Sequence, residues 1–236
     1  MFDFVRKPTL WKAWDAGLDE KIKSRGEFHL KSIQDLVVYD MLKEVQGQTI
    51  AEIGGGDSRV LPQLAKQNTC FNVDTFEGAG NGPTKKSVFK GVKNIPVFLG
   101  EYSEKLAPQS FDIVFSISVI EHVPTKDLDN FLKDGLRVLK PGGLWLHAID
   151  MYLEDSPDAG RQRLFERYRN WMKHPELTPV GDVYEGPPKF SCDMATNPDH
   201  MMYQWGKISP KLIDLRQRAQ STSILLAARK TGASPQ

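Results

Sequence analysis

The residues with the clearest chemical potential form one short run that contains three consecutive glycines. An apolar stretch leads to Glu52, and Gly54, Gly55 and Gly56 follow shortly after it. Apolar residues resume at Val60–Ala65 with helical spacing, so the run predicts a strand, a tight turn and a helix. Glycines let a ligand approach the backbone of such a turn, and the free N–H groups that open the helix face that ligand. The run is therefore a candidate nucleotide-type binding site.

Two kinds of nucleotide site compete for this loop. A dinucleotide site needs G-x-G-x-x-G, and counting from Gly54 and Gly56 places Arg59 at the third glycine position. Its side chain would obstruct the close packing of helix and strand that a third glycine permits. The other spacing, an acid followed two and four residues later by glycine, is met by Glu52 with small Ser58 next in the series. A third interpretation is a tight turn that binds nothing.

The composition is that of an ordinary globular protein. Of 236 residues 40% are apolar and 26% charged, and the net charge is +1, so the chain can bury a good core. Lys and Arg are scattered, which argues against a nucleic-acid surface, and no apolar run is long enough to span a membrane. Cys70 and Cys192 are far apart in the sequence, as expected of free thiols in a reducing compartment. We expect a cytoplasmic protein with a small-molecule partner; its oligomeric state stays open.

Acidic residues follow the next two predicted strands. Cys70–Val73 reads as a strand that ends at Asp74, 22 residues after Glu52. A carboxylate at that place can accept hydrogen bonds from both hydroxyls of a ribose. Pro96–Leu99 is predicted as the following strand, and Glu101 lies just beyond it. For each acid the alternative is an ordinary turn or loop residue.

The next block of sequence has an order of elements typical of a known family. The run FDIVFSISVIEHV at 111–123 predicts a buried strand and a turn, and Lys126–Leu139 predicts a helix with one apolar face. RVLKPGG at 137–143 overlaps its end, and Pro-Gly-Gly breaks the helix and leads into the strand Leu144–Ile149. Together with the acidic-x-Gly-x-Gly loop, this order resembles the class I S-adenosylmethionine-dependent methyltransferases over roughly residues 48–150.

The resemblance implies a fold. We expect one α/β domain over 1–236, with a doubly wound, seven-stranded, mostly parallel Rossmann-like sheet. Residues 1–48 would form a helical cap, 49–150 the cofactor-binding core, 151–220 an acceptor-side insert and 221–230 the last strand.

The resemblance also implies S-adenosylmethionine as the cofactor and assigns its site. The glycines approach the methionine part of the donor, Glu52 orders that end, Asp74 holds the ribose, and an acid and a tyrosine flank the adenine. Two serines lie at the carboxyl end of the fourth strand, where ligands bind in open α/β sheets. The expected cofactor-binding residues are Glu52, Gly54, Gly55, Gly56, Asp74, Glu101, Tyr102, Ser116 and Ser118.

Methyl transfer needs a positioned acceptor and, for some acceptors, a base that removes a proton. His122 lies just past the fourth strand and is the first candidate, because imidazole accepts a proton near neutral pH. The alternative is that His122 supports the turn before Pro124. Asp150, at the end of the fifth strand, is the second candidate. His147 reads as a packed strand residue.

A metal site is also conceivable from the resemblance. Small-RNA 2′-O-methyltransferases and certain ubiquinone-pathway O-methyltransferases carry Glu-x-x-Glu-His at this place and bind a divalent ion. Here Ser118 stands at the first Glu, which leaves Glu121 and His122 short of the ligands that a hard cation needs. We expect no metal.

The expected activity is methylation of a small molecule at oxygen, on a sugar, a glycan or a secondary metabolite. Aromatic and arginine side chains in the insert suit such an acceptor, although most could simply be core and solvated surface. Alternatives are N- or C-methylation, methylation of protein or RNA, and an inactive donor-binding subunit of a partner. A nicotinamide oxidoreductase is disfavoured by Arg59 and by the Pro-Gly-Gly segment.

Overall fold

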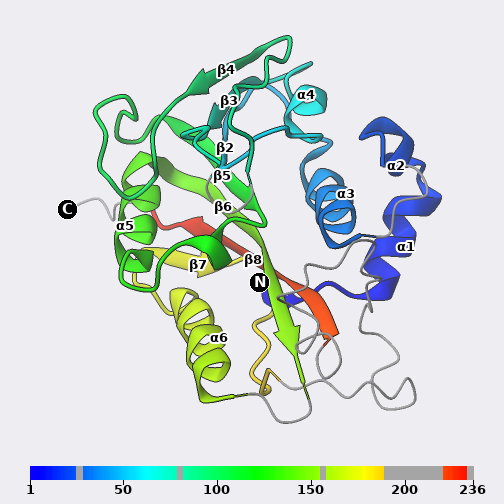
Figure 1. Ribbon diagram of the computed structural model, residues 1–236, viewed down its shortest axis with the longest axis vertical. Coiled ribbons are helices and arrows are strands. Elements are labelled where there is room, and N and C mark those ends of the chain that lie inside the picture. Colours follow the sequence, from blue (N-terminus) through cyan, green and yellow to red (C-terminus); the bar gives the residue numbers. More distant parts are fainter. Residues whose placement is uncertain (25–28, 79–81, 155–157, 189–219, 233–236) are drawn as a thin grey trace.

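The structure is a computed structural model that describes residues 1–24, 29–78, 82–154, 158–188 and 220–232. Within these residues one mixed sheet is flanked by helices on both faces (Figure 1). Its strands have the order β1-β8-β6-β5-β2-β3-β4, and β7 pairs with β8. The strands are β1 Phe2–Phe4, β2 Thr49–Ile53, β3 Thr69–Val73, β4 Val92–Ile95, β5 Phe111–Ile117, β6 Leu139–Leu153, β7 Leu177–Pro179 and β8 Gln220–Lys230.

Helices of the N-terminal part cover one face of the sheet and later helices cover the other. The alternation along β2 explains this, because Ile50 packs with the first group while Ala51 and Ile53 pack with the second. The first group comprises α1 Lys7–Asp15, α2 Leu18–Lys21, α3 Leu30–Leu42 and α4 Leu61–Leu64, and the second comprises α5 Leu128–Val138 and α6 Ala159–Trp171.

The strand count and the strand directions differ from the sequence-based prediction. The general Rossmann-like fold is confirmed, but the sheet of the described residues has eight strands instead of seven. β2, β3, β4, β5 and β6 run parallel, whereas β8 is antiparallel to β6, to β1 and to β7.

The expected helical cap over residues 1–48 begins with a strand. Phe2 and Phe4 are buried, and Phe2 lies opposite Leu226 of β8. Three residues are too few to reveal a two-residue alternation, so this pairing could not be read from the sequence. The helices α1 to α3 follow β1.

Two further predicted boundaries are wrong. The third parallel strand is β4, which ends at Ile95 opposite Val73 and so precedes the predicted Pro96–Leu99. Proline has no N–H to donate to a ladder, so Pro96 marks the end of the strand. Leu139 already pairs with Phe111, so the Pro-Gly-Gly segment lies inside β6 at a register shift.

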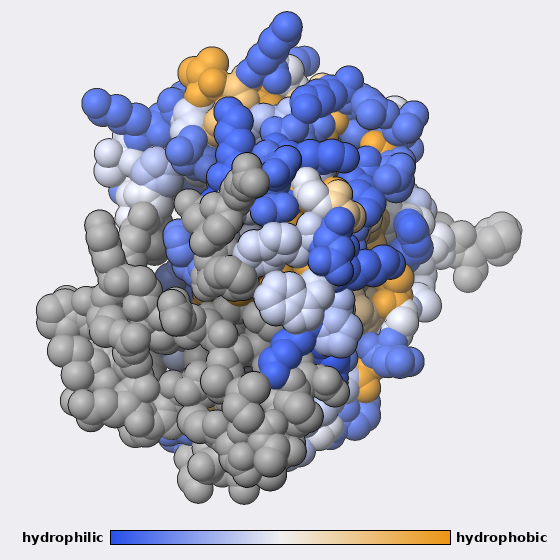
Figure 2. Space-filling view, turned by 90° about the vertical axis from the view of Figure 1, so that its right-hand side faces the viewer, coloured by the Kyte–Doolittle hydropathy of each residue, from blue (hydrophilic) through white to orange (hydrophobic). Residues whose placement is uncertain are grey.

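Much of the predicted insert at 151–220 lies outside the described residues, as does Cys192. Its described part contains α6 and the short β7. Among the helices that the structure describes, none is long and apolar enough to cross a bilayer. On the face shown in Figure 2, hydrophilic side chains predominate over the described residues and hydrophobic ones form small separate patches.

Candidate functional site

A cavity of about 350 Å³ lies where the strands β2, β3 and β5 end. Their carboxyl ends meet here because all three run parallel, and ligands bind at this edge of open α/β sheets. The glycine loop after β2 forms part of the lining, and Asp74 after β3 forms another part. Ser118 and His122, which follow β5, also line the cavity. The structure thus brings together most of the loop residues that the sequence singled out.

The glycine loop leaves room that side chains would fill. Gly54 and Gly56 have φ angles of +62° and +50°, a region that favours glycine. A Cβ atom on Gly56 would lie 2.8 Å from Cδ of Pro83, and one on Gly54 would lie 2.7 Å from Cγ2 of Val119. Both conformation and space therefore require glycine at these two positions.

Asp74 is held with its carboxylate at the cavity wall. Its Oδ2 accepts the N–H of Gly56 at 3.0 Å, and its Oδ1 accepts the N–H of Phe76 at 2.6 Å. Each carboxylate oxygen can accept more than one hydrogen bond. Asp74 is therefore oriented by the backbone and can still accept hydrogen bonds from the hydroxyls of a ligand.

Glu52 lies beneath the glycine loop and does not line the cavity. It is 2% exposed, and Ser58 donates a hydrogen bond of 2.5 Å to its Oε2. The Ser58 hydroxyl in turn accepts the N–H groups of Val60 and Leu61. Burial raises the pKa of Glu52 to about 8, against an ordinary value of 4.5. Glu52 thus supports the loop from below.

Helix α3 contributes residues that the sequence did not indicate. Lys31 lines the cavity, and its ammonium lowers the pKa of Glu52 by a smaller amount than burial raises it. Arg59 reaches the same helix, with Nε 2.7 Å from Oδ2 of Asp35 and a second hydrogen bond to Ser32. Arg59 therefore fastens the glycine loop to α3. A lysine on an amphipathic helix carries no local signal for such a role.

Ser118 connects the cavity to a buried polar network. Its φ is +54°, and its Oγ lies 2.6 Å from Oε1 of Gln34 and 2.8 Å from Oδ1 of Asp150. Gln34 donates to the same Asp150 oxygen at 2.9 Å. Asp150 is not part of the cavity lining. Burial and the charge of Asp150 raise the pKa of Glu121 well above its ordinary range.

Of the two candidate bases, His122 lines the cavity and Asp150 does not. It ends the short 3₁₀ helix η2 Ile120–His122, and its side chain is 48% exposed. Its Nε2 lies 3.9 Å from Oε1 of Glu121, too far for a hydrogen bond. Geometry therefore leaves the ring free to meet a bound acceptor, and its role as a base stays a prediction.

Ser116 and His147 lie inside the sheet, away from the cavity lining. Both are fully buried, and Oγ of Ser116 is 2.7 Å from Nδ1 of His147. Burial lowers the pKa of His147 to about 3, so the ring is neutral. His147 is a packed strand residue, as its position in the sequence predicts. Of the two expected serines, only Ser118 reaches the cavity.

Glu101 and Tyr102 also lie outside the cavity lining, and Tyr102 is 45% exposed. The wall is instead made by Val97, Phe98 and Leu99, which precede them in the same loop. An apolar wall suits a flat heterocycle. Glu101, the predicted acidic contact, therefore lies outside the cavity, and the residues just before it in the chain form the wall.

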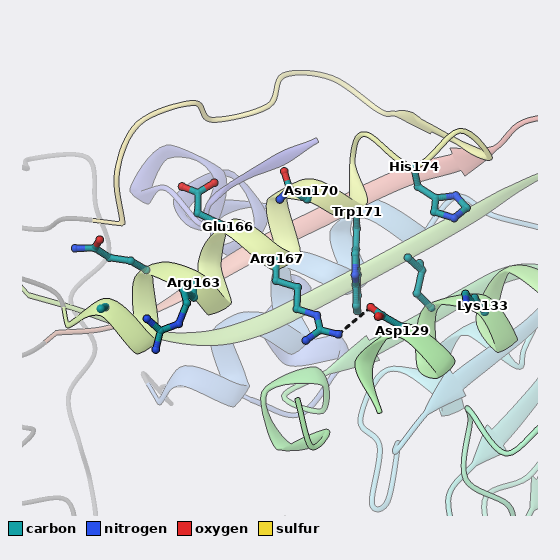
Figure 3. Close-up of a pocket in the computed structure, with 11 residues that line it drawn as sticks. Asp129, Lys133, Arg163, Glu166, Arg167, Asn170, Trp171 and His174 are labelled. Carbon is teal, nitrogen blue, oxygen red and sulfur yellow. Dashed lines mark hydrogen bonds and ion pairs between the residues drawn. The ribbon is translucent and has the colours of Figure 1, made fainter. Parts of the chain in front are cut away.

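A second, more open cavity of about 760 Å³ lies between α5 and α6 (Figure 3). Its charged side chains include both signs, and Arg167 of α6 forms an ion pair of 2.8 Å with Asp129 of α5. Trp171 lines the same groove. The groove lies away from the glycine loop and from Asp74, so we assign the ligand site to the cavity at the strand ends. Within the described residues, no group of three or more His, Cys, Asp or Glu could hold a metal ion.

The combination of fold, glycine loop and strand-end cavity matches one family. Residues 51–146 match the family model described as a methyltransferase domain. These residues form a methyltransferase domain, and its fold is the Rossmann-like fold of solved S-adenosylmethionine-dependent methyltransferases.

Relatives act on different acceptors. The tRNA (guanine-N(7)-)-methyltransferase of Helicobacter acinonychis is 33% identical over 189 residues, which cover 75% of this chain and 43% of that protein. The ubiquinone biosynthesis O-methyltransferase of Paramagnetospirillum magneticum is 28% identical over 110 residues, covering 46% of this chain and 43% of that protein. The chain thus spans less than half the length of these curated relatives.

Among solved structures, the 1,6-didemethyltoxoflavin-N1-methyltransferase of Burkholderia thailandensis is similar in fold. It was solved with its acceptor and S-adenosylhomocysteine, and it matches with a TM-score of 0.52 and 12% identity. The match covers 95% of this chain and 88% of that one. Because these relatives methylate both nitrogen and oxygen, the likeness does not identify the acceptor of this chain.

Proposed function

We propose that the chain binds S-adenosylmethionine in the strand-end cavity and transfers its methyl group to a small-molecule acceptor. The observation that carries the proposal is the convergence of the glycine loop, Asp74 and an apolar wall on one cavity. A volume of about 350 Å³ falls in the range of small-molecule sites. The required glycines at 54 and 56 and the oriented carboxylate of Asp74 fit a ligand that carries a ribose.

The residues divide into donor-binding and acceptor-facing groups. When bound, the donor supplies a methyl group that its sulfonium has already activated. Gly54–Gly56 admit the donor close to the backbone, Asp74 accepts hydrogen bonds from its hydroxyls, and Val97–Leu99 cover its apolar part. Glu52 supports the loop from beneath, and Glu101 and Tyr102 lie in the turn that follows the wall.

His122 faces the space that we assign to the acceptor. A neutral imidazole there can remove the proton of a hydroxyl group as the new bond to oxygen forms. Asp150 supports this side through Ser118, which contacts both Asp150 and the cavity. We propose oxygen as the acceptor atom, on a sugar, a glycan or a secondary metabolite, with no metal ion involved.

A second candidate is methylation of RNA at nitrogen, which the similarity to the Helicobacter acinonychis protein favours. The near-neutral charge of the chain weighs against it. C-methylation, protein methylation and an inactive donor-binding subunit are the further alternatives.

We also propose a single domain, with acceptor contacts from the N-terminal helices and from the segment after β6, and a cytoplasmic location.

Calorimetric titration with S-adenosylmethionine, S-adenosylhomocysteine and NADH tests the donor site first. We expect micromolar binding of both sulfur ligands and none of NADH, and we expect Gly56→Ala to abolish binding because of its contact with Pro83. Absence of sulfur-ligand binding in the native protein would refute the proposal. A transfer assay with labelled methyl donor against sugars, phenols and tRNA then separates the acceptor classes, and donor binding without any transfer would favour the inactive subunit.

A further inference from the structure

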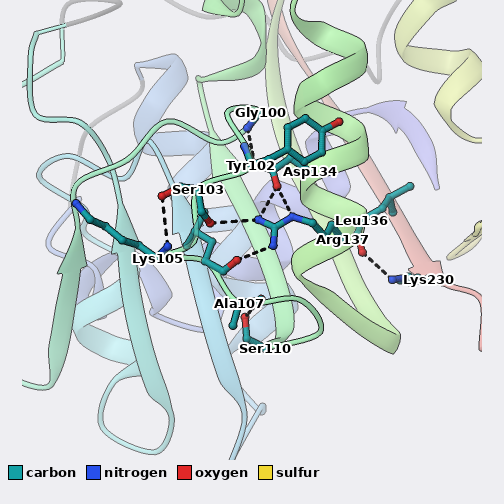
Figure 4. A network of polar contacts seen from close by, with 11 residues as sticks. Gly100, Tyr102, Ser103, Lys105, Ala107, Ser110, Asp134, Leu136, Arg137 and Lys230 are labelled. Carbon is teal, nitrogen blue, oxygen red and sulfur yellow. Dashed lines mark hydrogen bonds and ion pairs between the residues drawn. The ribbon is translucent and has the colours of Figure 1, made fainter.

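An ion pair on α5, whose carboxylate is buried, holds the loop that forms the apolar wall of the cavity (Figure 4). Asp134 is fully buried, and Arg137 lies one turn further along the helix. Nε of Arg137 donates to Oδ1 of Asp134 at 2.8 Å. The second oxygen of Asp134, Oδ2, accepts the backbone N–H of Gly100 at 2.7 Å and that of Tyr102 at 3.2 Å.

Arg137 fastens the far end of the same loop. Its Nη1 donates to the carbonyl oxygen of Leu106 at 2.7 Å, and its Nη2 lies 3.5 Å from the carbonyl oxygen of Ser103. The two side chains therefore hold four backbone groups between Gly100 and Leu106. We call this set of contacts the α5 clamp.

The loop needs such a clamp because its backbone is in an unfavourable conformation. Gly100 has a φ of +114°, and Tyr102 has a φ of +55°, which is uncommon for a residue with a side chain. The hydrogen bonds from Asp134 reach both of these residues. A buried carboxylate that accepts N–H groups can keep a backbone in a conformation that it would otherwise leave.

The clamped turn directly follows the wall of the cavity. Val97, Phe98 and Leu99 line the cavity, and Gly100 comes next in the chain. Phe131, one turn before Asp134 on α5, lines the cavity as well. A Cβ on Gly100 would lie 3.3 Å from the backbone nitrogen of Phe131, so loop and helix are in close contact. The α5 clamp thus fixes where the loop wall lies relative to Phe131.

We propose that Asp134 and Arg137 are positioning residues of the donor site, which set its apolar wall without touching the ligand. The inference rests on the proposed function, since it assumes that the donor occupies the strand-end cavity. Without the clamp, the loop spends only a fraction of its time in the conformation that completes the cavity. The apparent dissociation constant rises in inverse proportion to that fraction.

Asp134→Asn and Arg137→Lys test the proposal. An asparagine places an N–H₂ group against either the loop N–H groups or the guanidinium, and a lysine cannot reach several acceptors as a planar guanidinium does. Asp129→Asn is the matched control, because Asp129 lies on the same helix but forms its ion pair with Arg167 in the groove between α5 and α6 and does not line the strand-end cavity. Donor affinity is measured by calorimetry well below the melting temperature of each variant.

We expect the Kd for S-adenosylhomocysteine to rise about tenfold in both clamp variants and less than twofold in the control. Hydrogen exchange should become faster at residues 100–106 in the clamp variants and stay at the native rate in the control. Unchanged Kd in folded variants, with only a lower melting temperature, would overturn the inference. If Asp134→Asn does not fold, Arg137→Lys decides the question. A native protein that binds no donor would refute the proposed function instead, so the two failures are distinguishable.

Discussion

Replacement of Glu52 by glutamine should remove a large pH dependence of stability. The pKa of Glu52 is raised by burial, so the folded protein binds this proton more tightly than the unfolded chain does. The contribution of Glu52 to the free energy of unfolding is therefore highest below pH 4.5, falls as the pH rises toward 8, and is constant above that. Glutamine stays neutral at every pH and its carbonyl can still accept the Ser58 hydrogen bond.

The size of the effect follows from the two pKa values. The pKa is about 8 in the folded protein and 4.5 ordinarily. Each unit corresponds to about 1.4 kcal/mol, so native stability falls by up to about 5 kcal/mol relative to the glutamine variant between pH 4.5 and 8. Relaxation of the buried site and entry of water reduce this figure, and we expect at least about 2 kcal/mol.

Urea unfolding at pH 5, 6, 7 and 8 measures the difference between the two proteins at each pH. Taking the difference removes the contribution of all other titrating groups that the mutation leaves unchanged. Glu104→Gln serves as the control because Glu104 is exposed. The pH dependence of its free energy of unfolding should be the same as that of the native protein. If the free energy of unfolding depended on pH in the same way for the native protein and for Glu52→Gln, the reasoning would be refuted. If the donor's cationic groups lie above the loop, donor affinity should also rise between pH 6 and 8 in the native protein but not in Glu52→Gln.

Three further predictions concern single residues. Asp74→Asn should weaken donor binding by about tenfold with little change in fold, because its carboxylate is aimed at the cavity; unchanged calorimetric affinity would exclude a ribose contact. His122→Ala should lower turnover by about 10²- to 10⁴-fold while donor affinity stays the same; a near-normal rate would leave His122 a structural residue. Gly135→Ala should destabilise the fold by roughly 1–3 kcal/mol, because a Cβ there would overlap the ring of Trp145; an unchanged urea midpoint would contradict this.

The sequence by itself predicted the resemblance to methyltransferases, the parallel core and the glycine loop that lines the strand-end cavity. The glycine loop, Asp74 and the strand of residues 111–117 could be found because their roles depend on neighbours in the chain. A turn with positive φ needs glycine, and a buried strand needs an apolar run. Such requirements involve only residues that are neighbours in the chain, so the sequence alone reveals them. Where the strands run parallel, the groups that follow them lie at the same edge of the sheet.

Only the tertiary structure decided which side chains meet in the cavity. Lys31 lines the cavity because α3 packs on the sheet with its first turn near the strand ends, and Gln34 meets Asp150 across 116 residues of sequence. The same holds for the apolar wall at residues 97–99, which lines the cavity where the sequence predicted Glu101. These contacts depend on the packing of distant elements, and no local pattern encodes packing over such separations. Local rules therefore determined the glycine loop, while long-range packing determined which side chains surround it in the cavity.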